Sequence, residues 1–190
     1  MITTLIFIFI WTSGIYGYYA LLVSVPNLSI NTFVNTALAA LSEGPPSLIF
    51  MAVATLLGSR KSGLIVLQVL AGLCCLTIGF LSKAHFTQLV TASYMVGIFA
   101  FNAIALQLWL VTAEVYPTNL RSQAVSICSG VARVITLSSA FIGELSTIWR
   151  PLPMVLIGSS SLISSCLTYF LPESQDIELP HTFNQAFQNE

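Results

Sequence analysis

Arg133 stands deep inside an apolar stretch of this sequence. Counted from Ser122, it lies about 11 residues along, so a helix would carry it roughly 17 Å into a hydrocarbon core about 30 Å thick. Polar or small residues lie on the same helical face within two turns: Ser126, Ser129, Gly130 and Thr136. This face predicts a wet cavity around a charge that binds an ionic group. The alternative is a structural salt bridge to Glu43 or to a carboxylate outside this sequence.

Glu43 is another ionisable residue at membrane depth, about 15 Å into the apolar segment that starts near residue 33. A buried carboxylate there needs a partner or a water-filled cavity, which favours a functional role. Pro45 and Pro46 follow it and would kink the helix, freeing backbone carbonyls. The simpler interpretation is a kink that stabilises helix packing.

Aromatic side chains form two further candidate surfaces. Tyr16 and Tyr19 recur with Thr12 at helical spacing, and Asn102 and Trp109, seven residues apart, share another face. Such rings can stack on an organic substrate or on a cation. Aromatic stripes in membrane helices also serve as packing or interface anchors, so both interpretations stay open.

A charged turn, residues 113–122, separates two long apolar segments. It contains Glu114, Tyr116, Pro117, Thr118 and Arg121. The two charged residues could be anchors that extend into the headgroup region, or an ion pair that forms and breaks. The proline and threonine predict a stop and a new start of the helix.

The elements that must position these residues are predicted to be membrane helices. The chain is 56% hydrophobic and 7% charged, and its mean hydropathy is +0.88, which does not describe a soluble surface. We predict an all-α, polytopic fold, with a six-helix domain over residues 1–172 and a polar cytosolic tail over residues 173–190. The six apolar segments lie near residues 2–25, 33–57, 63–82, 86–113, 122–147 and 151–171.

Other classes of function are disfavoured. A net charge of −1 offers no surface for nucleic acid. The sequence has no zinc-protease motif and no phosphate-binding glycine loop, so we expect neither an enzyme nor a cofactor or metal. The cluster of small residues over 158–161 predicts close contact between helices.

Lysine and arginine in the short loops indicate the orientation. Arg60, Lys61 and Arg121 fall on one side of the predicted membrane, and Lys83 and Arg150 fall on the other. We therefore expect both termini in the cytosol. The expected location of this multi-pass protein is the plasma membrane, which the loop charges do not decide.

Several motifs resemble the organic ion transporters of the major facilitator superfamily. The charged turn resembles the loop between the fourth and fifth helices of their C-terminal half. The match continues through residues 130–134 and 152–153, and through the Leu-Pro-Glu-Ser run over residues 171–174. Earlier in the chain, residues 18–21 and 41–45 resemble the first and second helices of that half.

The resemblance implies that this chain is the C-terminal six-helix half of a secondary carrier that moves small organic ions by alternating access. Such transporters bind substrate between two pseudosymmetric halves, so a missing N-terminal six-helix half or a partner chain is implied. It also implies that Arg133 selects an organic anion or zwitterion over a cation. Tyr16, Tyr19, Glu43, Asn102 and Trp109 are expected to help bind the substrate.

Gating roles for Glu114, Arg121 and Arg60 are likewise expected from the resemblance. The family's loop before the third helix carries an aspartate, whereas residues 55–61 here contain no acid, which departs from a charge relay at Arg60. A different function stays open for a chain of this length. It could be a truncated, non-transporting membrane paralogue that associates with a full-length transporter and modulates it.

Overall fold

A computed structural model describes residues 2–24, 60–81, 87–116, 119–142 and 151–171, with single residues or pairs at 33, 36–37, 40–41, 144–145 and 149. Its long helices are α1 (Ile2–Ser24), α4 (Arg60–Leu81), α5 (Thr87–Val115), α6 (Arg121–Thr136) and α8 (Leu152–Tyr169). The 3-10 helix η2 (Leu137–Phe141) continues α6.

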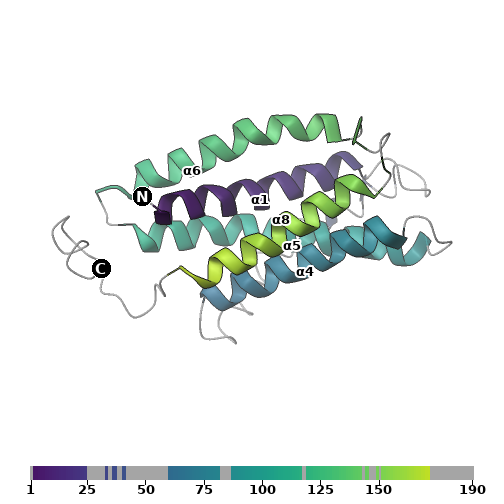
Figure 1. The fold of residues 1–190 in the computed structure, drawn as a ribbon, viewed down its shortest axis with the longest axis horizontal. Coiled ribbons are helices and arrows are strands. Elements are labelled where there is room, and N and C mark those ends of the chain that lie inside the picture. The colour runs from purple at the N-terminus through teal and green to yellow at the C-terminus, as the bar shows by residue number, and fades with distance from the viewer. Residues whose placement is uncertain are drawn as a thin grey trace.

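The described helices run side by side along the length of the molecule (Figure 1). α1 packs against α5, α6 and α8, while α4 packs against α5 and α8. Large side chains that are fully buried fill the centre, among them Phe7, Trp11, Phe101 and Leu108. α6 forms one edge of this bundle and packs chiefly against α1.

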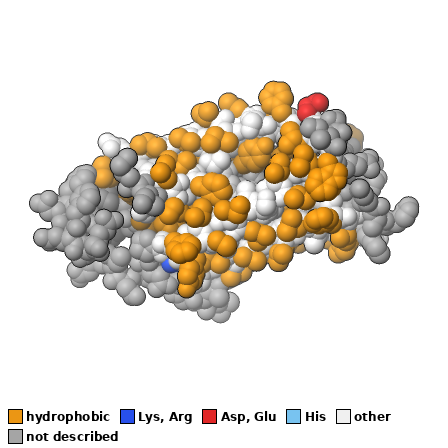
Figure 2. Space-filling view, viewed as in Figure 1, with side chains coloured by type: hydrophobic (Ala, Val, Ile, Leu, Met, Phe, Trp, Pro, Cys, Tyr) orange, Lys and Arg blue, Asp and Glu red, His pale blue; other side chains and the backbone are white. Residues whose placement is uncertain are grey.

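Five described helices are long and apolar enough to cross a membrane. The all-α prediction is therefore confirmed for the described residues. The predicted helix near 33–57 lies outside them apart from a few residues, so the count of six stays a prediction. The face in Figure 2 is almost wholly apolar, and its described charged atoms show only towards the two ends, as a lipid-facing surface requires.

Two predicted boundaries are corrected. α4 begins at Arg60 rather than near residue 63, because the charge of Lys61 is accommodated at this helix end: its Nζ donates to the Leu171 carbonyl and lies 5.6 Å from the Tyr169 ring centroid. The predicted segment 122–147 is not one α-helix, since the α-helical winding ends at Thr136 and a 3-10 winding follows.

The α4–α8 contact is closed by polar groups as well as by packing. The Gln68 amide donates to Ser164 Oγ at 3.0 Å, Thr168 Oγ1 donates to Gln68 Oε1 at 3.0 Å, and Ser161 Oγ donates to the Gln68 carbonyl at 2.9 Å. All four residues are buried. Each side-chain donor or acceptor named here thus has a partner in the opposite helix, as a low-dielectric interior demands.

Two glycines bring these helices close together. A Cβ on Gly158 would meet the Gly72 carbonyl oxygen at 3.0 Å, and a Cβ on Gly72 would meet Leu162 Cγ at 2.9 Å. The close helix contact predicted for residues 158–161 is confirmed here, because only a residue without a side chain fits at this crossing.

Candidate functional site

Arg133 lies in the last turn of α6, and its side chain is exposed. A positive charge at this end of a helix is favourable to the helix dipole. Of the small residues predicted to surround it, Ser129 and Thr136 are buried towards the bundle, while Ser126 and Gly130 are exposed. The exposed flank of α6 therefore carries a guanidinium and small residues within the apolar span Arg121–Phe141.

Trp109 is 45% exposed on α5 and rests on a buried aromatic support. The Trp11 ring meets it edge to face, with centroids 5.0 Å apart at 79°. Trp11 is itself fixed, because its indole N–H donates to Thr112 Oγ1 at 2.9 Å in the interior. The sequence interpretation missed Trp11, although an indole donor inside an apolar segment signals the need for a buried acceptor.

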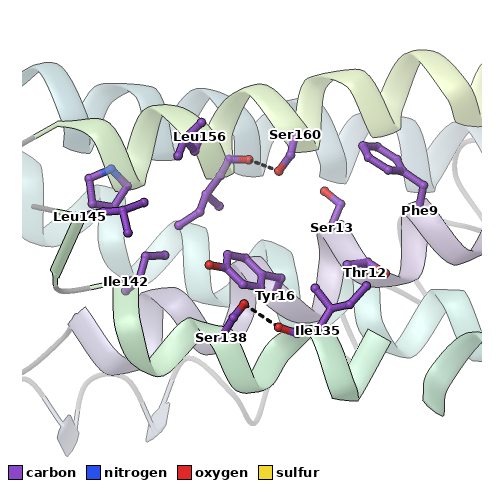
Figure 3. A pocket seen from close by; sticks show the side chains of 12 residues that line it. Phe9, Thr12, Ser13, Tyr16, Ile135, Ser138, Ile142, Leu145, Leu156 and Ser160 are labelled. Carbon is purple, nitrogen blue, oxygen red and sulfur yellow. Dashed lines mark hydrogen bonds between the residues drawn. The ribbon is translucent and has the colours of Figure 1, made fainter. Parts of the chain in front are cut away.

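A pocket of about 350 Å³ lies between α1, α6 with η2, and α8. Tyr16 and Ser13 project from α1 into this space, with Ser138 across from them and Ser160 on α8 (Figure 3). Its lining residues are Phe9, Thr12, Ser13, Tyr16, Ile135, Ser138, Ile142, Leu145, Pro153, Leu156, Ile157 and Ser160. Of the predicted binding residues, this pocket includes Tyr16 alone.

The other predicted binding residues lie elsewhere. Tyr19 is 47% exposed, and its ring meets that of Tyr18 edge to face at 5.2 Å. Asn102 is half-buried on α5. Glu43 lies outside the described residues. The structure thus divides the predicted set between the pocket and the exposed side chains on α1, α5 and α6.

The charged turn is tied to the start of α1. Tyr116 OH donates to Thr4 Oγ1 at 3.0 Å, and its ring lies 5.8 Å from that of Phe7. Burial raises the pKa of Tyr116, and the hydrogen bond to Thr4 opposes this in part, so the hydroxyl stays protonated near neutral pH. The turn is thereby held against α1 by a neutral hydroxyl donor.

The predicted gating residues flank this turn or begin α4. Glu114 and Arg121 are both half-buried, and Arg121 Nε is enclosed with no acceptor among the described residues. A buried guanidinium nitrogen without an acceptor is costly, so this position favours an additional partner. Arg60 is the first residue of α4, where the structure describes the backbone alone.

Comparison with known proteins gives transporters as relatives. The chain is 32% identical to human solute carrier family 22 member 16 over 177 residues, which are 93% of this chain and 30% of that protein. It is 32% identical to human organic cation/carnitine transporter 2 over 185 residues, or 97% of this chain and 33% of that protein. A Drosophila melanogaster organic cation transporter-like protein is 33% identical over 175 residues, or 92% of this chain and 30% of that protein.

No protein-family profile matches the chain. The chain spans about a third of the length of the curated relatives it matches. Its homologues are nevertheless transporters rather than enzymes, and they match it along most of its own length. With the five apolar helices, they indicate a multi-pass integral membrane protein.

Proposed function

We propose that this chain is the C-terminal six-helix half of a major facilitator carrier that moves small organic ions by alternating access. The observation that carries the proposal is its similarity to organic cation/carnitine transporters over 97% of its residues. The five described apolar helices support it, since they satisfy their backbone groups internally and fit a membrane domain.

Arg133 selects the charge of the substrate in this proposal, which favours an organic anion or a carboxylate-bearing zwitterion. It lies in the apolar span 121–141, about 18 Å from the start of the span and about 14 Å from its end. A guanidinium so near the middle of a bilayer needs a wet cavity or an anionic partner. Its paired N–H donors suit a carboxylate.

The aromatic residues on the neighbouring helices supply the uncharged part of this site. Trp109 presents an exposed ring on the fixed Trp11, so it can stack on an organic group with little loss of side-chain freedom. Tyr19 and Asn102 contribute further contact and hydrogen bonding, and Glu43 is assigned to substrate binding as well.

A second set of helices must cover the flank that bears Arg133. Facing it towards lipid would cost about 3 kcal/mol or more. We assign this role to the missing N-terminal half or to a partner chain. Arg121, with its enclosed Nε, and Glu114 and Arg60 then form cytosolic contacts that change as the two halves rock. In this arrangement the carrier spans the plasma membrane, and both of its termini are cytosolic.

The test is a chimaera in which this chain replaces the matching segment of organic cation/carnitine transporter 2. Uptake of benzoate and of a benzyltrimethylammonium ion is measured at equal surface level. Loss of a charged hydrogen bond to the substrate lowers binding about 10–100-fold. Arg133→Lys and Arg133→Ala should therefore lower benzoate uptake by up to about 100-fold. Arg133→Asp should abolish it or shift preference to the cation.

The matched control is Val134→Ala, which alters the adjacent exposed position of α6 without changing charge. Unchanged benzoate uptake in Arg133→Ala would eliminate the selector role. Rescue of a defective Arg133→Glu by Glu43→Arg would instead indicate a structural ion pair. A chimaera that reaches the surface and takes up neither ion would count against the carrier and favour the non-transporting paralogue.

A further inference from the structure

The pocket between α1, η2 and α8 differs chemically from the flank that bears Arg133. None of the twelve described residues that line it is charged. Its volume of about 350 Å³ falls in the range of small-molecule sites, roughly 300–1,000 Å³. An ion enclosed there would lose its hydration without gaining a counter-charge from the lining, which costs several kcal/mol.

The hydroxyl groups in the pocket are not equivalent. Three of them donate to carbonyls of their own helices: Thr12 to Ile8 at 2.7 Å, Ser138 to Ile135 at 2.7 Å, and Ser160 to Ile157 at 2.8 Å. Figure 3 shows the last two of these bonds. Within the described part of the chain, Ser13 and Tyr16 form no such bond and remain available to a ligand.

Ser13 and Tyr16 lie three residues apart on α1, so their side chains are neighbours on one helical face. Ser13 is only 7% exposed, and Tyr16 is half-buried. A hydroxyl held in an apolar pocket gains most from a ligand oxygen, because water is scarce there. The two hydroxyls can therefore hydrogen-bond the same ligand oxygen in a pocket that is otherwise mostly apolar.

The pocket and Arg133 lie on different flanks of α6. Ile135 lines the pocket, and two residues of α-helix rotate its side chain about 200° from that of Arg133. The surface between them packs on α1 through buried residues such as Cys128 and Ala132. A ligand in the pocket thus binds apart from an ion at Arg133.

We propose that this pocket is a second ligand site, which takes an uncharged, largely apolar organic molecule from the bilayer and hydrogen-bonds its oxygen through Tyr16 and Ser13. Phe9, Ile135, Leu156 and Ile157 supply the apolar contact. The site is independent of the ion that the carrier moves.

The experiment uses a photoreactive aryl diazirine alcohol as the probe, with the full chain in detergent micelles and peptide mapping by mass spectrometry. The carboxylate and ammonium analogues of the same probe are the charged comparisons. We expect the alcohol to label peptides of α1 and α8 at saturable sites. Its apparent affinity should exceed that of either charged analogue by at least tenfold.

A matched pair of variants locates the site. Ser159 and Ser160 are adjacent on α8, both are partly exposed, and each donates to a carbonyl of its own helix three residues back. Only Ser160 lines the pocket. Ser160→Leu should fill the pocket and abolish saturable labelling, whereas Ser159→Leu should retain it.

A second comparison tests the two available hydroxyls. Tyr16→Phe and Ser13→Ala should each weaken binding of the alcohol probe about three- to tenfold. Thr12→Val should leave the affinity unchanged, because the Thr12 hydroxyl is bonded within α1. These mild variants decide the matter if Ser160→Leu fails to fold. Equal labelling by charged and uncharged probes, or equal affinity in Tyr16→Phe, Ser13→Ala and wild type, would overturn the proposal.

Discussion

The α4–α8 contact and the exposed flank of α6 treat polar groups in apolar helices in opposite ways: one buries them and bonds them to each other, and the other leaves them on the surface. In the first, Gln68 and three hydroxyl residues bond to one another inside the protein. In the second, Arg133 points outwards, and only 33% of the α6 span is buried, against 44% for each of the other four spans. The first arrangement stabilises the folded chain by itself, whereas the second leaves a charged side chain exposed, which the proposed function assigns to binding.

The largest effect on stability should come from Gly158, which packs against Gly72 where α4 and α8 cross. Gly158→Leu forces a side chain against the Gly72 backbone, so we expect a loss of about 3 kcal/mol in the free energy of unfolding. Gly130→Leu on α6 is the control, because no atom lies within 4 Å of its Cβ position. Denaturation by dodecyl sulfate in mixed micelles, followed by circular dichroism, measures both. Similar losses of unfolding free energy in the two variants would contradict the proposed difference in packing between these regions.

Removing the amide of Gln68 should have the next largest effect. Gln68→Leu keeps the volume but removes the amide that bonds Ser164 Oγ and Thr168 Oγ1 across the two helices, at an expected cost of about 1–2 kcal/mol; Thr168 keeps the Ser164 carbonyl as an acceptor at 2.8 Å. Gln88→Leu, at an exposed position in the first turn of α5, should change stability by less than about 0.5 kcal/mol. The same unfolding assay compares them. A neutral Gln68→Leu would show that packing alone holds α4 to α8.

Trp11 links the interior to the exposed surface, so its replacement should have an intermediate effect. Trp11→Phe loses the hydrogen bond to Thr112 and part of the contact with Trp109, for about 1 kcal/mol. A double-mutant cycle with Thr112→Val should give a coupling energy of about 0.6 kcal/mol. Zero coupling would contradict the role of this bond in fixing the aromatic pair.

Arg133 should matter least for stability. Since its side chain is exposed, Arg133→Gln should alter the free energy of unfolding by less than about 0.5 kcal/mol, while benzoate uptake by the chimaera falls at least tenfold. Unfolding and uptake are measured on the same preparation. A loss of stability as large as that of Gln68→Leu would assign Arg133 to the folded scaffold instead.

The sequence was sufficient to predict most helix positions, because long apolar segments leave few alternatives. α1 ends within one residue of its predicted end, and α5 begins one residue later and ends two residues later than predicted. Pairing between helices was not predictable: nothing in the periodicity of residues 63–82 indicates that Gln68 faces Ser164 and Thr168, about 100 residues away. Only the small residues at 158–161 signalled a close contact there.

The candidate site shows the same limit. Helical spacing predicted one face for Thr12, Tyr16 and Tyr19; Thr12 and Tyr16 line the pocket, whereas Tyr19 does not. The spacing did not reveal Ser13, Ser138 or Ser160, which reach the pocket through the packing of three helices. The roles of Arg133, Trp109, Tyr19 and Asn102 stay predictions, because they depend on a ligand and on contacts that the packing of the described helices does not define.

The change from α-helical to 3-10 winding at Leu137 couples the length of this segment to the rotation of the residues that follow it. Five residues in the 3-10 form rise about 0.5 Å more each than in an α-helix and turn about 20° further. Rewinding them would shorten the helix by about 2.5 Å and rotate everything beyond Phe141 by about 100°. Ile142 would then leave the pocket wall, so a ligand in the proposed site would oppose this rewinding.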